Sequence, residues 1–182
     1  MPKYTMSDLN ALDTKAAVDL IGGIFEHSPW IVRESWPQRP FTSVEALHAT
    51  LCETIRDAAT DRQLDLIRAH PDLVGRAAQA GTLTRESTGE QRAAGLGPDD
   101  LTPDEIETFT RSNAAYKDTF GFPFVICARE NRKASILAAF PIRLDHDAAT
   151  ERDTALGEIE RIGWYRLIDL VDNDPIGQAQ RE

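Results

Sequence analysis

One histidine of this chain lies directly before a proline, in the run His70-Pro71-Asp72. A proline fixes its own φ and keeps the preceding residue out of the helical region. His70 is therefore expected at the end of a helix, with its side chain held in one direction. An imidazole titrates near neutral pH, so a fixed one can act as a general acid or base. The alternative is that the helix simply ends here and His70 is a half-buried polar residue.

A polar cluster of Ser87, Glu90 and Gln91 follows further along the chain and could belong to the same site as His70. Ser87 and Glu90 also have the spacing of a capping box. In that arrangement both side chains only satisfy backbone N–H groups at the start of a helix. The sequence does not decide between a cap and a catalytic group for Glu90.

The helix expected at 147–171 carries an arginine on its apolar side. At about 100° per residue, Arg161 points to solvent, whereas Arg166 lies within an apolar stripe of Leu156, Ile159, Ile162, Gly163, Leu167 and Leu170. An arginine is almost never buried without a partner. Arg166 is therefore either structural, through a buried ion pair or a side chain that reaches the surface, or a guanidinium placed to bind a carboxylate in a pocket.

The helix expected at 103–120 similarly carries an amide among apolar residues. Asn113 shares a face with Ile106, Phe109, Tyr116 and Phe120. Because a buried amide usually binds backbone polar groups, we expect a structural role for Asn113.

Helical periodicity and helix caps run along the whole chain, and no stretch has the alternation or the hairpin turns of β-structure. The clearest helix begins at Thr102, with a cap, a proline and a capping-box glutamate, and is expected to end at Gly121. Residues 122–128 are apolar but contain a proline, which indicates an extended buried segment. Other helices are expected at 7–27, 29–36, from Thr42 to beyond Ile55, at 60–70, 71–81, from Ser87 to Gly95, at 132–144 and 147–171.

The predicted fold is therefore all-α, a single compact domain of about seven or eight helices. Residues 1–171 are expected to form this domain and residues 172–182 a flexible C-terminal tail. The chain shows no internal repeat and no linker long enough for a second domain.

The composition is that of a globular protein, with 41% hydrophobic and 27% charged residues. A net charge of −10 argues against nucleic-acid binding, which needs a basic face, but not against a small anionic substrate beside a local arginine. No apolar run has the length of a membrane helix, and neither a signal-peptide core nor a peroxisomal address is present. The two cysteines lack CxxC spacing and the four histidines lack metal-binding spacing. We expect a cytoplasmic protein, and the spacing does not support a metal site.

Seven motifs occur in order along most of the chain. They are His-Ser-Pro-Trp at 27–30, Arg39-Pro-Phe, Ala-His-Pro-Asp-Leu at 69–73 with Gly75, Ser-x-x-Glu-Gln-x-x-Ala-Gly-Leu at 87–96, Asn113-x-x-Tyr116, Phe-Gly-Phe-Pro-Phe-Val-Ile-Cys-Ala at 120–128, and Glu158 with Tyr-Arg-Leu at 165–167. Together they resemble the decarboxylases of 2-oxo-4-hydroxy-4-carboxy-5-ureidoimidazoline (OHCU), which complete the conversion of urate to allantoin.

The resemblance implies an all-helical homodimer that forms (S)-allantoin and carbon dioxide from OHCU, with urate oxidase and hydroxyisourate hydrolase as functional partners. It implies that His70 protonates the carbanion left by decarboxylation, and that Glu90 and Arg166 act with it on the small anionic substrate. The same resemblance assigns substrate binding to Pro71, Ser87, Gln91, Phe124, Val125, Ile126, Cys127 and Ala128. It implies neither a metal nor an organic cofactor, because the substrate itself delocalises the carbanion.

Two other functions fit the same residues. A non-enzymatic helical scaffold would use Arg166 and Asn113 as structural polar residues, and replacement of His70 would then be silent. A metal-assisted hydrolase would use His70, Asp72 and Glu90 as ligands or bases, and metal analysis of the purified protein would reveal it.

Overall fold

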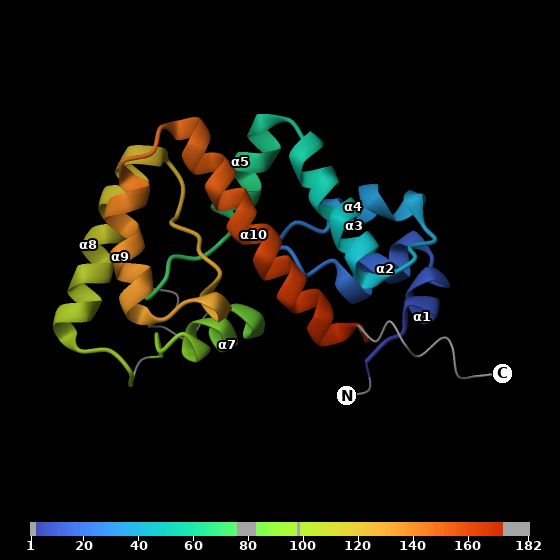
Figure 1. Cartoon of the computed structure of the whole chain (residues 1–182), viewed down its shortest axis with the longest axis horizontal. Coiled ribbons are helices and arrows are strands. Elements are labelled where there is room, and N and C mark those ends of the chain that lie inside the picture. Colours follow the sequence, from blue (N-terminus) through green and yellow to red (C-terminus); the bar gives the residue numbers. More distant parts are fainter. Residues whose placement is uncertain (1–2, 76–82, 98, 173–182) are drawn as a thin grey trace. The chain divides into compact units, whose positions relative to one another are not determined.

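A computed structural model describes residues 3–75, 83–97 and 99–172, and within these residues the ordered backbone is helical (Figure 1). They form nine α-helices and two short 3-10 helices. The strand-like pairing in this part of the chain is a single isolated bridge between Tyr4 and Val171. The predicted all-α fold is confirmed.

The chain divides into two compact units. The first combines the residues up to Thr60 with those from Gly163 onward, and the second is Asp61–Ile162. The boundary falls inside helix α10 (Ala148–Leu170), which contributes residues to both units. The division into a domain of residues 1–171 and a tail of residues 172–182 stays a prediction, and residues 173–182 lie outside the described part of the chain.

The first unit is built from short helices that surround an apolar core. In it α3 packs against α2 and α4. The helices are α1 (Met6–Asn10), α2 (Thr14–Ile21), α3 (Trp30–Ser35), the 3-10 helix η1 (Trp36–Gln38) and α4 (Val44–Asp57). The largest fully buried side chains of this unit are Trp36, Phe25, Leu9, Ile21, Ile31, Leu47, Leu51 and Ile55.

The predicted single helix at 7–27 is wrong, because the chain starts a helix twice in this region. Thr5 caps α1 in a capping box with Asp8. Asp13 then accepts a hydrogen bond from the Ala16 N–H at 2.8 Å and caps α2. Short polar side chains bind nearby backbone N–H groups and so favour helix starts over helix interiors. The apolar periodicity continues across the break, which is why it suggested one helix.

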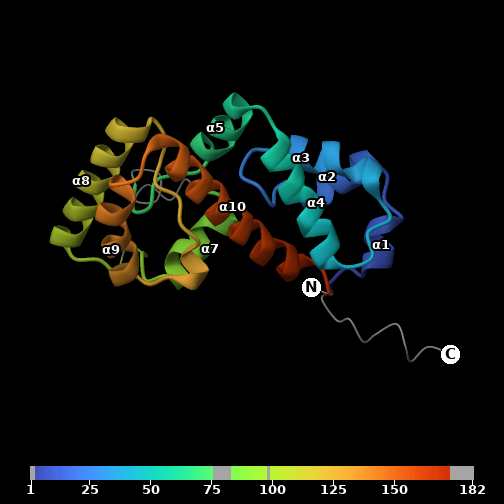
Figure 2. The ribbon, with the colours of Figure 1, turned by 45° about the horizontal axis from the view of Figure 1, so that its top comes forward.

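In the second unit two long helices lie side by side in both views of the ribbon, α8 (Pro103–Phe120) and α9 (Lys133–Leu144) (Figures 1 and 2). The start of α8 is as predicted, with Thr102 and Glu105 in a capping box, and Gly121 ends it at φ 74°. Glycine adopts this left-handed conformation without the steric cost of a side chain. The remaining elements of this unit are α5 (Thr60–Arg68), α7 (Arg85–Ala93) and η2 (Ala128–Glu130).

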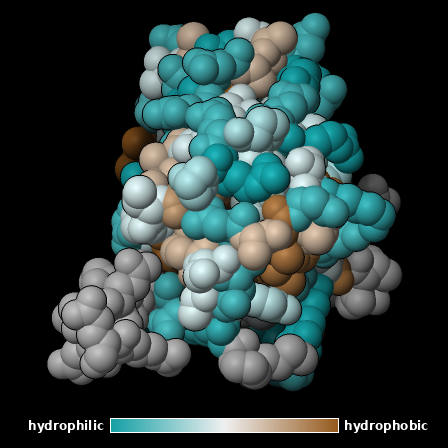
Figure 3. Space-filling model, turned by 90° about the vertical axis from the view of Figure 1, so that its right-hand side faces the viewer, coloured by the Kyte–Doolittle hydropathy of each residue, from teal (hydrophilic) through white to brown (hydrophobic). Residues whose placement is uncertain are grey.

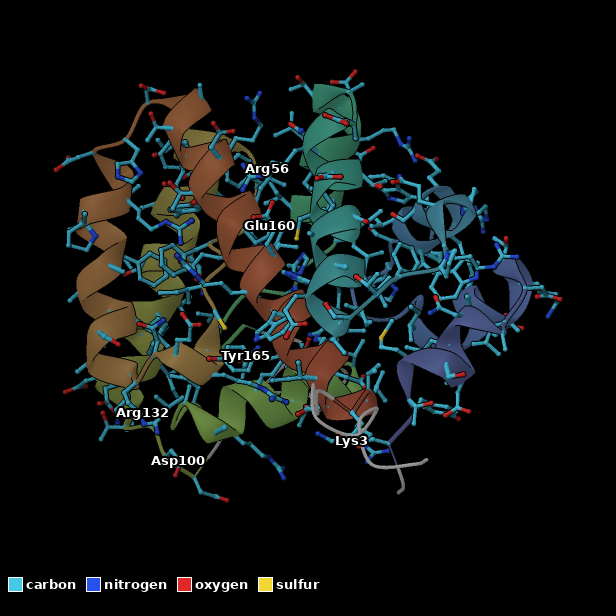
Figure 4. All side chains as sticks on the ribbon, turned by 45° about the vertical axis from the view of Figure 1, so that its right-hand side comes forward. Lys3, Arg56, Asp100, Arg132, Glu160 and Tyr165 are labelled. Atoms are coloured by element: carbon cyan, nitrogen blue, oxygen red, sulfur yellow. The ribbon has the colours of Figure 1, made fainter. Side chains whose placement is uncertain are left out.

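The end of α10 is tied to the N-terminal residues of the first unit. Lys3 Nζ donates to the Ile168 carbonyl at 2.7 Å, and Figure 4 labels Lys3 beside the last turns of the helix. Tyr4 N–H donates to the Leu170 carbonyl at 3.0 Å. Further back along α10, a Cβ on Gly163 would lie 2.5 Å from the Phe25 ring. Glycine therefore allows this close approach of ring and helix.

The face shown in Figure 3 is mostly hydrophilic, and its apolar residues form small patches separated by polar ones. This agrees with the net charge of −10 and with burial of most large apolar side chains. Among the described residues, no helix is long and apolar enough to cross a membrane.

Candidate active site

His70 lies two residues beyond the end of α5, as its position before a proline predicts. The side chain is buried, and Nδ1 donates to the Leu66 carbonyl at 2.9 Å. A carbonyl oxygen can only accept, so this bond places a proton on Nδ1 in the neutral ring. Nε2 then carries a proton only when the ring is an imidazolium. The orientation of the ring is therefore fixed, and Nε2 is the nitrogen available for proton transfer.

The turn after His70 is held by two amide side chains from other helices. Val74 N–H donates to Gln91 Oε1 at 3.1 Å, and Asn113 Nδ2 donates to the Leu73 carbonyl at 2.8 Å. Val74 has φ 55°, which is strained for a β-branched residue and persists only where neighbouring groups hold it. The helix predicted from Pro71 is absent over residues 71–75, because these backbone groups bond to side chains instead; residues 76–82 lie outside the described residues. The structural role predicted for Asn113 is confirmed.

Helix α7 carries the polar cluster, but it does not start where the sequence suggested. Thr84 is its N-cap and accepts a hydrogen bond from the Ser87 N–H at 3.2 Å. Ser87 is therefore inside the helix, and the capping-box explanation for Glu90 is wrong. Ser87 and Gln91 are buried one turn apart on one face, and Glu90 is half-buried. A role of Glu90 in the site stays a prediction.

The segment Phe124–Ala128 is buried and non-helical up to Cys127, as predicted for an extended core segment. The Phe124 ring stacks on Phe140 with centroids 4.0 Å apart, so only its backbone could meet a ligand. Burial raises the pKa of the Cys127 thiol to about 11, which keeps the thiol neutral. The 3-10 helix η2 begins at Ala128 and packs against α7, so this segment and the polar cluster are neighbours.

A buried network of charged groups lies behind this segment. Glu151 accepts hydrogen bonds from Arg143 Nε at 2.7 Å, from His146 Nδ1 at 2.7 Å and from the Tyr116 hydroxyl. Burial raises the pKa of Tyr116, so its hydroxyl stays protonated and donates. Arg143 Nη1 in turn donates to the Val125 carbonyl at 2.5 Å. The network thus connects α9 and α10 to the predicted substrate-binding segment.

Arg166 is buried, as its place on the apolar stripe predicts, and it belongs to the first unit, whereas the other predicted site residues belong to the second. Its Nη1 donates to Glu26 Oε2 at 2.9 Å and to the Ile24 carbonyl at 3.2 Å. The side chains of Arg166 and Glu26 are 5% and 3% exposed, so the ion pair is almost fully desolvated. Arg161 is 54% exposed, as predicted. The structural alternative for Arg166 is therefore observed, and a contact with substrate stays a prediction.

Two of the three residues proposed for a metal-assisted hydrolase, Asp72 and His70, each bind another group through one polar atom. Asp72 Oδ2 accepts from Lys117 Nζ at 2.6 Å, and His70 Nδ1 is bound to the Leu66 carbonyl. In the described ranges, no group of three or more His, Cys, Asp or Glu side chains is arranged to hold a metal ion. The described residues thus offer no ligand set for that hydrolase.

All candidate site residues, from His70 to Arg166, lie within one stretch of the chain that matches a known protein family. The family model for OHCU decarboxylase matches residues 10–168. The chain belongs to the OHCU decarboxylase family.

Several known proteins resemble this chain over nearly its whole length. The 2-oxo-4-hydroxy-4-carboxy-5-ureidoimidazoline decarboxylase of Haloferax volcanii is 40% identical over 174 residues, which are 96% of this chain and 100% of that protein. The uric acid degradation bifunctional protein PucL of Bacillus subtilis is 39% identical over 178 residues, 98% of this chain and 35% of that protein. A crystal structure of (S)-allantoin synthase superposes with a TM-score of 0.72 at 28% identity, covering 93% of this chain and 54% of that one.

Three buried charged residues, Glu26, Arg143 and Glu151, were not predicted from the sequence, although Arg143 left a signal. Arg143 follows Ile136 and Phe140 at helical spacing, and all three are buried, which is the pattern that singled out Arg166. Glu151 has no such signal, because its neighbours in sequence are polar and its partners Tyr116 and Arg143 lie on other helices. Only the tertiary structure could show that it is 0% exposed.

Proposed function

We propose that this chain is a decarboxylase that converts OHCU to (S)-allantoin and carbon dioxide in urate degradation. The family match over residues 10–168 carries this proposal. The site of the second unit supports it, because a buried histidine with a fixed ring suits the delivery of a proton to one face of a carbanion. A scaffold would not need that orientation.

In the proposed reaction the substrate carboxylate leaves as carbon dioxide, and its electron pair stays on the ring carbon. A proton from Nε2 of the His70 imidazolium then forms the new C–H bond, and water restores the proton to the ring. Because Nδ1–H is bound to the Leu66 carbonyl, Nε2 is the acidic position. A donor fixed on one side of the carbanion gives one enantiomer, whereas spontaneous decay has no such preference.

Glu90, Ser87 and Gln91 are proposed to bind the hydroxyl and ureido groups of the substrate. Since Gln91 Oε1 already accepts the Val74 N–H, the Gln91 amide NH₂ is the end that can donate to a substrate oxygen. Pro71 and the backbone of Phe124–Ala128 are proposed to line the same site, next to α7.

Arg166 is proposed to bind the substrate carboxylate or a ring carbonyl, a role that only the family resemblance supports. Arg166→Lys should then weaken substrate binding strongly, because an ammonium group cannot reproduce the planar two-point contact of a guanidinium. Arg161→Lys is the matched control on the exposed side of the same helix and should leave KM unchanged. Steady-state kinetics of both variants measure the difference. Equal, small effects would remove Arg166 from the substrate site.

Chelators are expected to leave the activity intact, because the proposed substrate stabilises its own carbanion. Activity should be compared before and after dialysis against EDTA, with elemental analysis of the dialysed protein. Loss of turnover together with a stoichiometric metal, and its return on adding that metal, would favour the hydrolase alternative instead.

The test of the function is circular dichroism at an allantoin band while urate oxidase and hydroxyisourate hydrolase consume urate. Addition of this protein should produce the signal of (S)-allantoin at a rate proportional to its concentration. An unchanged signal would contradict the proposal.

Urate oxidase and hydroxyisourate hydrolase are also the proposed functional partners of this protein. A homodimer and a cytoplasmic location complete the proposal and rest on the resemblance and the sequence.

A further inference from the structure

The backbone of the segment Phe124–Ala128 is held at two alternate residues by charged side chains. Arg143 Nη1 donates to the Val125 carbonyl at 2.5 Å, and Glu158 Oε2 accepts the Cys127 N–H at 2.8 Å. Hydrogen bonds to charged groups are about twice as strong as neutral ones. Both are therefore well suited to fix the position of a short non-helical segment.

Ile126 lies between the two held residues, and its backbone N–H and C=O groups face the other side of the segment. In an extended chain, successive residues direct their N–H and C=O groups to opposite sides. Among the residues that the structure describes, none makes a hydrogen bond to the N–H or C=O of Ile126, although Ile126 is buried. Buried backbone groups are nearly always paired with protein, water or a ligand. The side of the segment that faces away from Arg143 and Glu158 is thus the side that can meet a ligand.

Arg143 can hold the Val125 carbonyl firmly because its own guanidinium is fixed. Glu151, which is 0% exposed, accepts from Arg143 Nε at 2.7 Å and also from Nη2. The Arg143 guanidinium carbon lies 4.4 Å from the centre of the Phe124 ring. The arginine therefore contacts both the backbone and the side chain of the segment.

Glu158 uses its two carboxylate oxygens for different purposes. Oε2 accepts the Cys127 N–H, whereas Oε1 faces the exposed Arg161, whose Nη1 lies 2.5 Å away. Because the Arg161 side chain is 54% exposed, solvent screens its charge and this ion pair contributes little to stability. The bond to the backbone and the bond to Arg161 can therefore be removed separately by mutation.

We propose that Glu158 and Arg143 are positioning residues, which hold Phe124–Ala128 so that the backbone groups of Ile126 meet the substrate. This inference rests on the proposed function. Without either anchor the segment gains conformations in which these groups are misplaced, and substrate binding weakens by the free energy needed to restore the bound conformation. The effect falls on KM more than on kcat, because neither side chain touches the reacting atoms.

Four variants separate the backbone bond from the ion pair. Glu158→Ala removes both bonds and should raise KM about tenfold, the usual effect of losing a hydrogen bond to a charged group. Glu158→Gln keeps an acceptor for the Cys127 N–H and should restore most of the substrate affinity. Glu158→Asp keeps the charge but is one methylene shorter, so its KM should rise as well. Arg161→Gln removes the ion pairs of Arg161 with Glu158 and with the exposed Glu130, leaves the Cys127 N–H bond in place, and should behave like the wild type.

The measurements are KM and kcat in the coupled urate assay, and calorimetric titration with (S)-allantoin as a probe that needs no turnover. Thermal midpoints verify that all variants are folded at the assay temperature, and Glu158→Asp replaces Glu158→Ala if that variant does not fold. The inference is overturned if Glu158→Ala, or Glu158→Asp in its place, has the same KM as Arg161→Gln. A wild-type chain without decarboxylase activity would instead overturn the proposed function.

Discussion

Replacing His70 with asparagine is expected to lower the decarboxylation rate by about 10²–10⁴-fold, the usual contribution of a general acid. The asparagine amide reaches about as far as Nδ1 does, so it can keep the hydrogen bond to the Leu66 carbonyl. What it removes is Nε2, the proposed proton donor.

The stereochemistry of the product gives a second measure of the same variant. Because OHCU also decays without an enzyme, product should still form with His70→Asn, but its allantoin should approach a racemate. Optical activity is followed from urate with urate oxidase and hydroxyisourate hydrolase present, and far-ultraviolet circular dichroism checks that the helical content is unchanged. If (S)-allantoin accumulates at the wild-type rate, His70 is not the proton donor.

Glu151→Ala is expected to have the largest effect on stability, a loss of about 3–5 kcal/mol in the free energy of unfolding. The carboxylate is 0% exposed and accepts from Arg143, Tyr116 and His146. Removing it leaves the Arg143 charge buried without its partner, and solvent cannot replace that partner. Denaturant titration of the variant and the wild type measures the difference.

Asp19→Ala is the matched control for this prediction, because it also removes one partner of an ion pair. Lys15 and Asp19 lie 2.6 Å apart on α2, but their side chains are 84% and 62% exposed. Water and salt screen such a pair, so its loss should leave the denaturation midpoint unchanged. If the free energy of unfolding fell by the same small amount in both variants, the buried Arg143–Glu151 pair would contribute no more to stability than a surface ion pair.

The ends of several helices were predicted correctly, because they depend on interactions between near neighbours in the sequence. Helix α8 begins at the capping box of Thr102 and Glu105 and ends at Gly121, because these residues satisfy backbone groups within a few positions of themselves. His70 ends up beyond the end of α5 because the restriction imposed by Pro71 is also local. Where one interaction between near neighbours dominates, the sequence contains all the information needed.

Local signals failed where two of them competed. The region 7–27 has a continuous apolar periodicity, yet Thr5 and Asp13 each start a helix. Ser87 has the spacing of a cap, yet Thr84 takes that position and leaves Ser87 and Gln91 on a buried face. In both regions several polar side chains could have bonded to the backbone, and packing of the apolar residues selects among them.

The sequence by itself determined the all-α fold, the family, and which residues could do chemistry. The tertiary structure decided which of these have partners. Arg166 meets Glu26, and Gln91 meets the Val74 N–H, across 140 and 17 residues of sequence. Glu158 meets the Cys127 N–H across 31 residues. A buried charge or amide must find a complementary group wherever the fold brings one close, and the free energy of that pairing depends on burial and distance. Neither quantity exists until the chain has folded.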